Sequence, residues 1–396
     1  MGFTAEQRLL LDCASLETDA ARMGRIRAAV EAGVDWRLLA EWADRHRVTL
    51  LLARRIEEIC PAALEEPDAK ILKHRCRLVA RNNLKLTREL LAILALFERH
   101  GIATVPLKGP VLAVAAFGSL SLREFADLDV LVRADQLEAA CALIQAAGYV
   151  PEYDLPPRRK ASYIRWQHAF TFHRAHDDIT IEIHWRLHDR YLSFPLTEKA
   201  LWSGVRTEEM FGGAIRRLKP EHDFLFLCMH GAKHYWERIE WIGCLNALAR
   251  TIPSERWPGM IGEANRLRCR RLLHLGLLLA DNLSACDATR RGLELLEPDP
   301  AVNALAATVW RHVFAAEIEG ASKEVYRLRF YLKAREHLLD RVKLIWSSSV
   351  RIPHPESSTW DESPLPDFLS FLYYVLRPLN LLKKFGLRGL RGVLRT

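Results

Sequence analysis

The stretch from Thr104 to Val132 limits the fold of this chain more than any other part of the sequence. A short apolar run ends at Lys108-Gly109, a segment that can be helical follows, and Asp127-Leu128-Asp129 leads into a second apolar run. Residues at i and i+2 of a strand point to the same face, so the two aspartates share one. Two adjacent carboxylates repel each other and are typical of a site for a hard cation such as Mg²⁺. An edge strand with two solvated acids is the alternative.

A second strand is predicted at residues 179–185, where apolar and polar residues alternate. Its polar face carries Glu182 and His184. If this strand lies beside the Asp127/Asp129 strand, it adds a third carboxylate to the same face. Packing in the core is the favoured role of His184, and support of the acids is the alternative.

These two stretches carry a resemblance to a known family. The pattern L-K-G…R…D-x-D-x-L-V from Leu107 to Val132 and the run E-x-H-W from Glu182 to Trp185 resemble a bacterial family of uncharacterised nucleotidyltransferases in the polymerase-beta-like superfamily. The resemblance spans most of the chain, but only these stretches are specific. It implies an α+β fold, with a small mixed sheet as the nucleotidyltransferase core and helical regions on both sides.

The resemblance also implies which residues form the site. The catalytic, metal-binding residues would be Asp127, Asp129 and Glu182, which would hold two Mg²⁺ ions. The nucleotide would contact Lys108, Gly109, Arg123 and Lys233, and Arg123 has a second possible role as an anchor of the loop before Asp127. A base would meet Tyr235 or Trp236. No acid stands just after Trp241-Ile242-Gly243, where related sequences are expected to have one, which leaves an acidic role in the second domain without support.

Three functions fit these residues. The first is Mg²⁺-dependent transfer of a nucleoside monophosphate from a nucleoside triphosphate to a hydroxyl of an unidentified small molecule or protein. The second is an RNA nucleotidyltransferase acting on tRNA ends, which the net charge of +8 allows but no visible RNA-binding module favours. The third is a non-catalytic descendant that binds a nucleotide or a partner. All three expected acids are present, which favours an active transferase.

The length of 396 residues predicts two or three units. We expect an N-terminal helical region at 1–100, the core at 101–190, a helical domain closing the nucleotide cleft at 191–345, and a basic C-terminal helix and tail at 346–396. That last segment is predicted to pack on the helical domain, and contact with an anionic membrane surface is the alternative.

Several local elements follow from periodicity and capping signals. Within the core we expect strands at 103–107, 128–132, 169–173 and 180–185, helices at 110–117 and 136–147, and a polar loop at 156–160 over the site. Asp135 is the expected N-cap of the second helix, and Gly148 its stop. Gly118-Ser119 is interpreted as the end of the first helix, because treating it as the phosphate-side turn leaves too few residues before Asp127.

The flanking helices carry further expectations. A helix is predicted from Phe224 through Trp236, with Asp223 as a possible cap. His230 and His234 have zinc-ligand spacing on it, but the H-E-x-x-H pattern is absent and packing is favoured. The helix at 68–100 is expected to bury Leu84, Leu86, Leu90, Leu91, Leu94 and Leu96, and its basic stripe is expected to be solvated.

The cysteines and the hydropathy pattern indicate the compartment. Eight cysteines are scattered without a C-x-x-C pair, which argues against a zinc ribbon and a disulfide framework. The sequence also lacks an apolar run of ~18 residues. We therefore expect a cytoplasmic protein.

Overall fold

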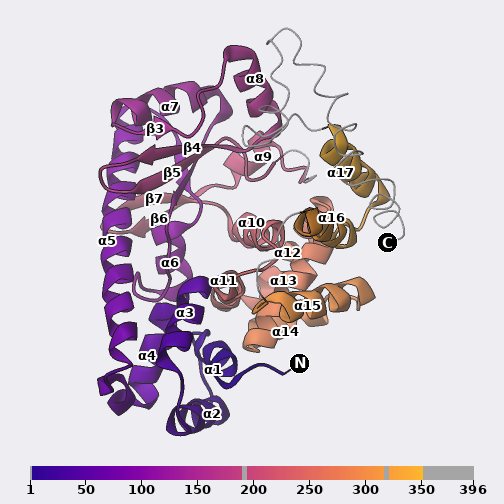
Figure 1. Ribbon diagram of the computed structural model, residues 1–396. Helices are drawn as coiled ribbons and strands as arrows, with labels where there is room; N and C mark the ends of the chain where they lie inside the picture. Colours follow the sequence, from indigo (N-terminus) through magenta and orange to yellow (C-terminus); the bar gives the residue numbers. More distant parts are fainter. Residues whose placement is uncertain (1, 190–193, 316–320, 351–396) are drawn as a thin grey trace.

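The fold is α+β, as predicted, with a mixed five-stranded sheet and helices on both sides (Figure 1). The computed structural model describes residues 2–189, 194–315 and 321–350. The strands lie in the order β1-β2-β5-β4-β3. Their bounds are Thr104–Pro106 (β1), Leu128–Val132 (β2), Val150–Pro151 (β3), Ala169–Arg174 (β4) and Ile179–His184 (β5).

Helices make up most of the remaining described chain. Before the sheet lie α1 (Ala5–Cys13), α2 (Ala20–Glu31), α3 (Trp36–His46), α4 (Thr49–Ile59) and α5 (Lys70–Arg99). Within the core lie α6 (Gly109–Phe117), α7 (Leu137–Ala146) and α8 (Pro157–Trp166). After it come α9 (Glu198–Ser203), α10 (Pro220–Lys233), α11 (Ile239–Arg250), α12 (Trp257–Arg266), α13 (Arg270–Leu283), α14 (Asp287–Glu294), α15 (Pro300–His312), α16 (Ala321–Ala334) and α17 (Leu338–Val350).

The sheet has one face against α5 and α7 and the other toward the C-terminal helices. On the first face, Val130 and Ile181 are fully buried in a cluster that includes Leu90 of α5 and Ile144 of α7. On the second face, Leu131 belongs to a separate cluster that extends into α10, α11 and α13. Asp129 shares a face with Leu131, because the two residues are two apart on β2. The predicted acids therefore lie between the sheet and the C-terminal helices.

The local elements around the acids agree with the sequence in most respects. Helix α6 begins beside Pro110 and ends where Gly118 takes a left-handed φ of 72°, so Gly118 stops the helix as predicted. Strands β4 and β5 form the expected hairpin. The seven-residue segment 121–127 leads into β2 without a helix. The placement of the phosphate-side turn at Lys108-Gly109 stays a prediction.

Other local predictions are wrong. The short 3₁₀ turn Ala134–Gln136 precedes α7, so Asp135 lies in that turn and the N-cap is Gln136. The expected loop at 156–160 is instead the beginning of α8, because Pro157 at the first helical position suits a helix start. Leu84 is 64% exposed on α5, since it lies off the buried face of that helix.

The region after the core also differs from expectation. A hairpin of β6 (Arg206–Met210) and β7 (Gly213–Arg217) interrupts the predicted helical unit. Helix α10 begins at Pro220 with Lys219 as its N-cap, and Asp223 instead accepts a 2.9 Å hydrogen bond from Arg217. The helix ends at Lys233, because Tyr235 and Trp236 both take a left-handed φ.

Two expectations remain predictions. The division into four units is not decided by the sheet and helices alone. The C-terminal tail from residue 351 onward lies outside the described residues. Among the described residues, no helix is both long and apolar enough to cross a membrane.

Candidate active site

The site is built on two parallel strands. Strand β2 pairs with β5 in parallel register, and Asp129 lies directly opposite Glu182. The sequence predicted this juxtaposition, and it places the two carboxylates on one face of the sheet. Asp127 stands just before β2, whose first residue is Leu128, and it interacts electrostatically with both other acids.

Lys108 forms an ion pair with one of these acids, Asp129. Its Nζ is 3.1 Å from Oδ2 of Asp129, and this ion pair is almost fully buried. The residue caps the N-terminus of α6, and Gly109 follows it with a φ of 57°. A side chain at position 109 would be strained in that conformation. The turn thus holds a cation and a helix N-terminus beside Asp129.

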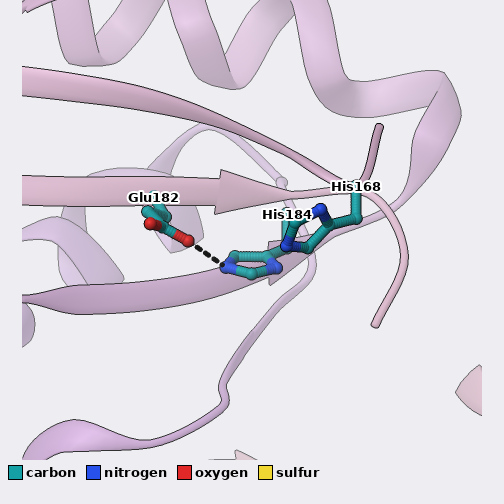
Figure 2. Close-up of side chains that lie close together, drawn as sticks. All are labelled: His168, Glu182 and His184. Atoms are coloured by element: carbon teal, nitrogen blue, oxygen red, sulfur yellow. Dashed lines mark ion pairs between the residues drawn. The ribbon is translucent and has the colours of Figure 1, made fainter. Parts of the chain in front are cut away.

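His184 connects two of the acids, and Figure 2 shows its ion pair with one of them, Glu182. Its Nε2 lies 3.0 Å from Oδ1 of Asp129 and 3.1 Å from Oε2 of Glu182. Burial alone would lower the pKa of His184, but its hydrogen bonds to the two carboxylates outweigh burial and raise the pKa to about 9. At neutral pH the ring is therefore an imidazolium held between two acids.

The three acids have different proton affinities. Burial opposes ionisation of Asp129, but Lys108 and His184 outweigh it and hold the pKa of Asp129 well below its usual range. Burial likewise opposes ionisation of Glu182, yet the hydrogen bond from His184 lowers its pKa. Burial and the charge of Asp129 raise the pKa of Asp127. Asp129 is therefore the most firmly ionised of the three acids.

Arg123 is held away from solvent by three contacts. Its Nη2 donates to Oε1 of Glu240 at 2.6 Å, its Nη1 to the Gly109 carbonyl at 3.2 Å, and its Nε lies 3.2 Å from Sγ of Cys244. Of its two predicted roles, these contacts match the anchoring of the loop before Asp127. Glu240 lies one helical turn before Cys244 and is the acid that pairs with Arg123. The sequence did not predict this partner.

Lys233 reaches the site from α10. Its Nζ lies 3.2 Å from Nε2 of His168 and 3.7 Å from Oδ2 of Asp189. His168 in turn has its Nδ1 2.7 Å from Oδ1 of Asp189. Burial, reinforced by the charge of Lys233, lowers the pKa of His168, so the ring is neutral. His168 and Asp189 were not predicted, and no local motif marks them.

The other residues proposed on α10 do not line the site as expected. Trp236 is fully buried, and its ring lies directly against Gly231, so it is a core residue and cannot stack on a base. His230 and His234 have ring centroids 4.8 Å apart, and burial lowers the pKa of each. Within the described residues, the donor atoms close enough together to hold a metal ion belong to His168, Glu182 and His184. The role of His230 and His234 stays a prediction.

Comparison with known proteins gives one match. A family model described as uncharacterised nucleotidyltransferase matches residues 32–284, which include the acids, Lys108, Arg123, His168 and Lys233. No curated protein and no solved structure matches. The matched segment covers more than half of the chain and contains every residue of the site described above. This chain therefore belongs to the family of uncharacterised nucleotidyltransferases.

Proposed function

We propose that the protein is a Mg²⁺-dependent nucleotidyltransferase that moves a nucleoside monophosphate from a nucleoside triphosphate to a hydroxyl of a small molecule or protein. The observation that carries this proposal is the parallel register of Asp129 with Glu182, beside Asp127 and the Lys108-Gly109 turn. Family membership supports nucleotidyl transfer as the reaction class. The hydroxyl acceptor and the dependence on Mg²⁺ are part of our proposal.

The side chains fit Mg²⁺ as ligands. Carboxylate oxygens are the donors that this hard cation prefers. Oδ2 of Asp129 is buried and has no hydrogen-bond partner among the described residues, although the Lys108 ammonium lies 3.1 Å away as an ion pair. Asp127, Asp129 and Glu182 would hold the metal. Two bound Mg²⁺ ions would lower the pKa of the attacking hydroxyl and neutralise charge on the phosphoryl oxygens.

The cationic residues would bind the triphosphate. Lys108 would leave Asp129 for a phosphate oxygen, since the metal then supplies the positive charge that Asp129 needs. The N-terminus of α6, which follows Lys108, would add backbone N–H donors for phosphate. Lys233 would approach from α10, and Arg47 and Arg238 interact electrostatically with Asp127 as well. Four cations around the acids suit an anionic substrate.

Glu182 would receive the proton of the acceptor hydroxyl. Its side chain is 30% exposed, so an acceptor can reach it from solvent. The imidazolium of His184 would stabilise the negative charge on Glu182 and Asp129 and fix their orientation. Arg123 would keep the Gly109 carbonyl in place and thereby the turn on which phosphate binds.

The test is pyrophosphate release from each of the four triphosphates with Mg²⁺, with and without a cell extract that supplies acceptors. We expect release by the unaltered protein and a loss of at least about 10²-fold in the Asp127→Asn/Asp129→Asn variant. Asp135→Asn, an exposed acid outside the site, is the matched control. Nucleotide binding without release in any extract would contradict transfer and favour a binding protein, and salt-dependent release that needs RNA would favour an RNA acceptor.

A further inference from the structure

A second group of donors lies beside the three acids. Side-chain donor atoms of His168, Glu182 and His184 all lie within 4.8 Å of one another (Figure 2). The antiparallel pairing of β4 with β5 creates this group, because Ala169 lies opposite His184 and brings His168 alongside. We propose that these three residues bind a divalent transition-metal ion of the Zn²⁺ class, at a position that shares Glu182 with the Mg²⁺ site but is otherwise distinct from it.

The donor set differs in kind from the aspartates. Two imidazole nitrogens and one carboxylate oxygen favour borderline ions such as Zn²⁺ or Co²⁺, whereas Mg²⁺ prefers oxygen alone. Three protein ligands with an open fourth position are typical of catalytic zinc and not of structural zinc. His168, Glu182 and His184 therefore favour a different cation from the one that the three acids favour.

His168 is oriented as a metal-binding histidine is. Its Nδ1 donates to Asp189 at 2.7 Å, and that carboxylate is 2% exposed. Such a hydrogen bond fixes the tautomer in which Nε2 keeps its lone pair. The lone pair already faces a positive charge, because Lys233 Nζ lies 3.2 Å from Nε2. A metal ion at Nε2 would take the place of that ammonium.

An independent observation comes from His184. Its ring is 2% exposed, and its Nδ1 has no hydrogen-bond partner among the described residues. An unpartnered buried ring nitrogen is costly unless a ligand satisfies it. A metal ion at Nδ1 would displace the proton that makes this ring an imidazolium in the metal-free protein, so binding would release one proton. The group can nevertheless be reached from solvent, since the Glu182 side chain is 30% exposed and that of His168 is 16% exposed.

Co²⁺ is the probe, because nitrogen-ligated Co²⁺ absorbs visible light and Mg²⁺ does not. The full chain, freed of metals with a chelator, is titrated with Co²⁺, and Zn²⁺ is then added as a competitor. We expect visible bands that Zn²⁺ abolishes and that excess Mg²⁺ leaves largely intact. His168→Ala should weaken Co²⁺ binding by at least about 100-fold, and Asp189→Asn by about 10–100-fold.

Three variants make the test decisive. His173→Ala removes an exposed histidine of β4, the strand that follows His168, and should leave Co²⁺ binding unchanged. Lys233→Met keeps every ligand and removes the competing ammonium, so Co²⁺ should bind more tightly. Asp127→Asn should abolish transfer yet keep the bands, which separates failure of this site from failure of the proposed function.

Two spectroscopic results would overturn the proposal. One is the absence of visible bands at millimolar Co²⁺, and the other is an identical spectrum for the unaltered protein and His168→Ala. Unchanged or weaker binding in Lys233→Met would exclude an ion at Nε2 of His168. That last measurement holds even if His168→Ala does not fold, since Lys233→Met leaves the histidine in place.

Discussion

Replacing Arg123 by methionine should destabilise the protein strongly. The guanidinium is 6% exposed, and its partner Glu240 is 4% exposed, with 2.6 Å between Nη2 and Oε1. Methionine fills a similar volume but leaves the Glu240 carboxylate buried without its cation. The Gly109 carbonyl loses a donor as well. Arg123 also links the Lys108-Gly109 turn to α11, so its loss should loosen the contact between the core and the C-terminal helices.

The expected size of the effect follows from the burial of both charges. Breaking a buried ion pair by removing one partner costs about 3–5 kcal/mol, because an uncompensated charge remains. Removing both charges leaves no such charge. Arg123→Met/Glu240→Met should therefore lose several kcal/mol less than the sum of the two single variants.

Urea unfolding at 25 °C, followed by far-UV circular dichroism and by tryptophan fluorescence, measures these free energies. Coincident transitions by the two probes would support a two-state analysis. The control is Arg54→Met, which breaks an exposed i,i+4 pair with Glu58 and should cost only about 0.3–0.5 kcal/mol. A loss below about 1 kcal/mol in Arg123→Met, or additive losses in the double variant, would refute the reasoning.

Three further predictions concern single positions. Gly231→Ala should cost about 1–3 kcal/mol in urea unfolding, because the new methyl group would overlap the Trp236 ring, whereas Gly262→Ala has open space and should cost little. Glu124 accepts hydrogen bonds from the first N–H groups of α4, and burial raises its pKa to about 7 against an ordinary value of 4.5. Because the pKa of Glu124 is higher in the folded state, the free energy of unfolding should fall as pH rises from about 4.5 to 7. Glu124→Gln should reduce this pH dependence in thermal melting experiments. An unchanged pH dependence would exclude Glu124 as its source. Gly109→Ala should reduce nucleotide affinity in equilibrium titration, because alanine is strained at a φ of 57°, and unaltered affinity would show that the turn does not need this conformation.

The sequence by itself predicted the local elements of the core and the acids on them. Alternation at 179–185 identified β5, and Gly118 marked the end of α6. These features depend on hydrogen bonds and side-chain periodicity between near neighbours, which the sequence displays directly. Strand alternation predicted Asp127 and Asp129 on one face with Glu182 beside them, and the register of β2 with β5 places Asp129 opposite Glu182.

Only the tertiary structure decided what surrounds those acids. His168 meets Lys233 across 65 positions of the chain, and Arg123 meets Glu240 across 117. Such contacts arise when whole elements bury their apolar faces, and no local pattern encodes which charged side chains then come together. Trp236 shows the same limit, because a left-handed φ after Lys233 turned its ring away from the site and into the core. The physical reason is that periodicity and capping depend on residues close in the sequence. The side chains that meet across the fold depend instead on how whole helices and strands pack.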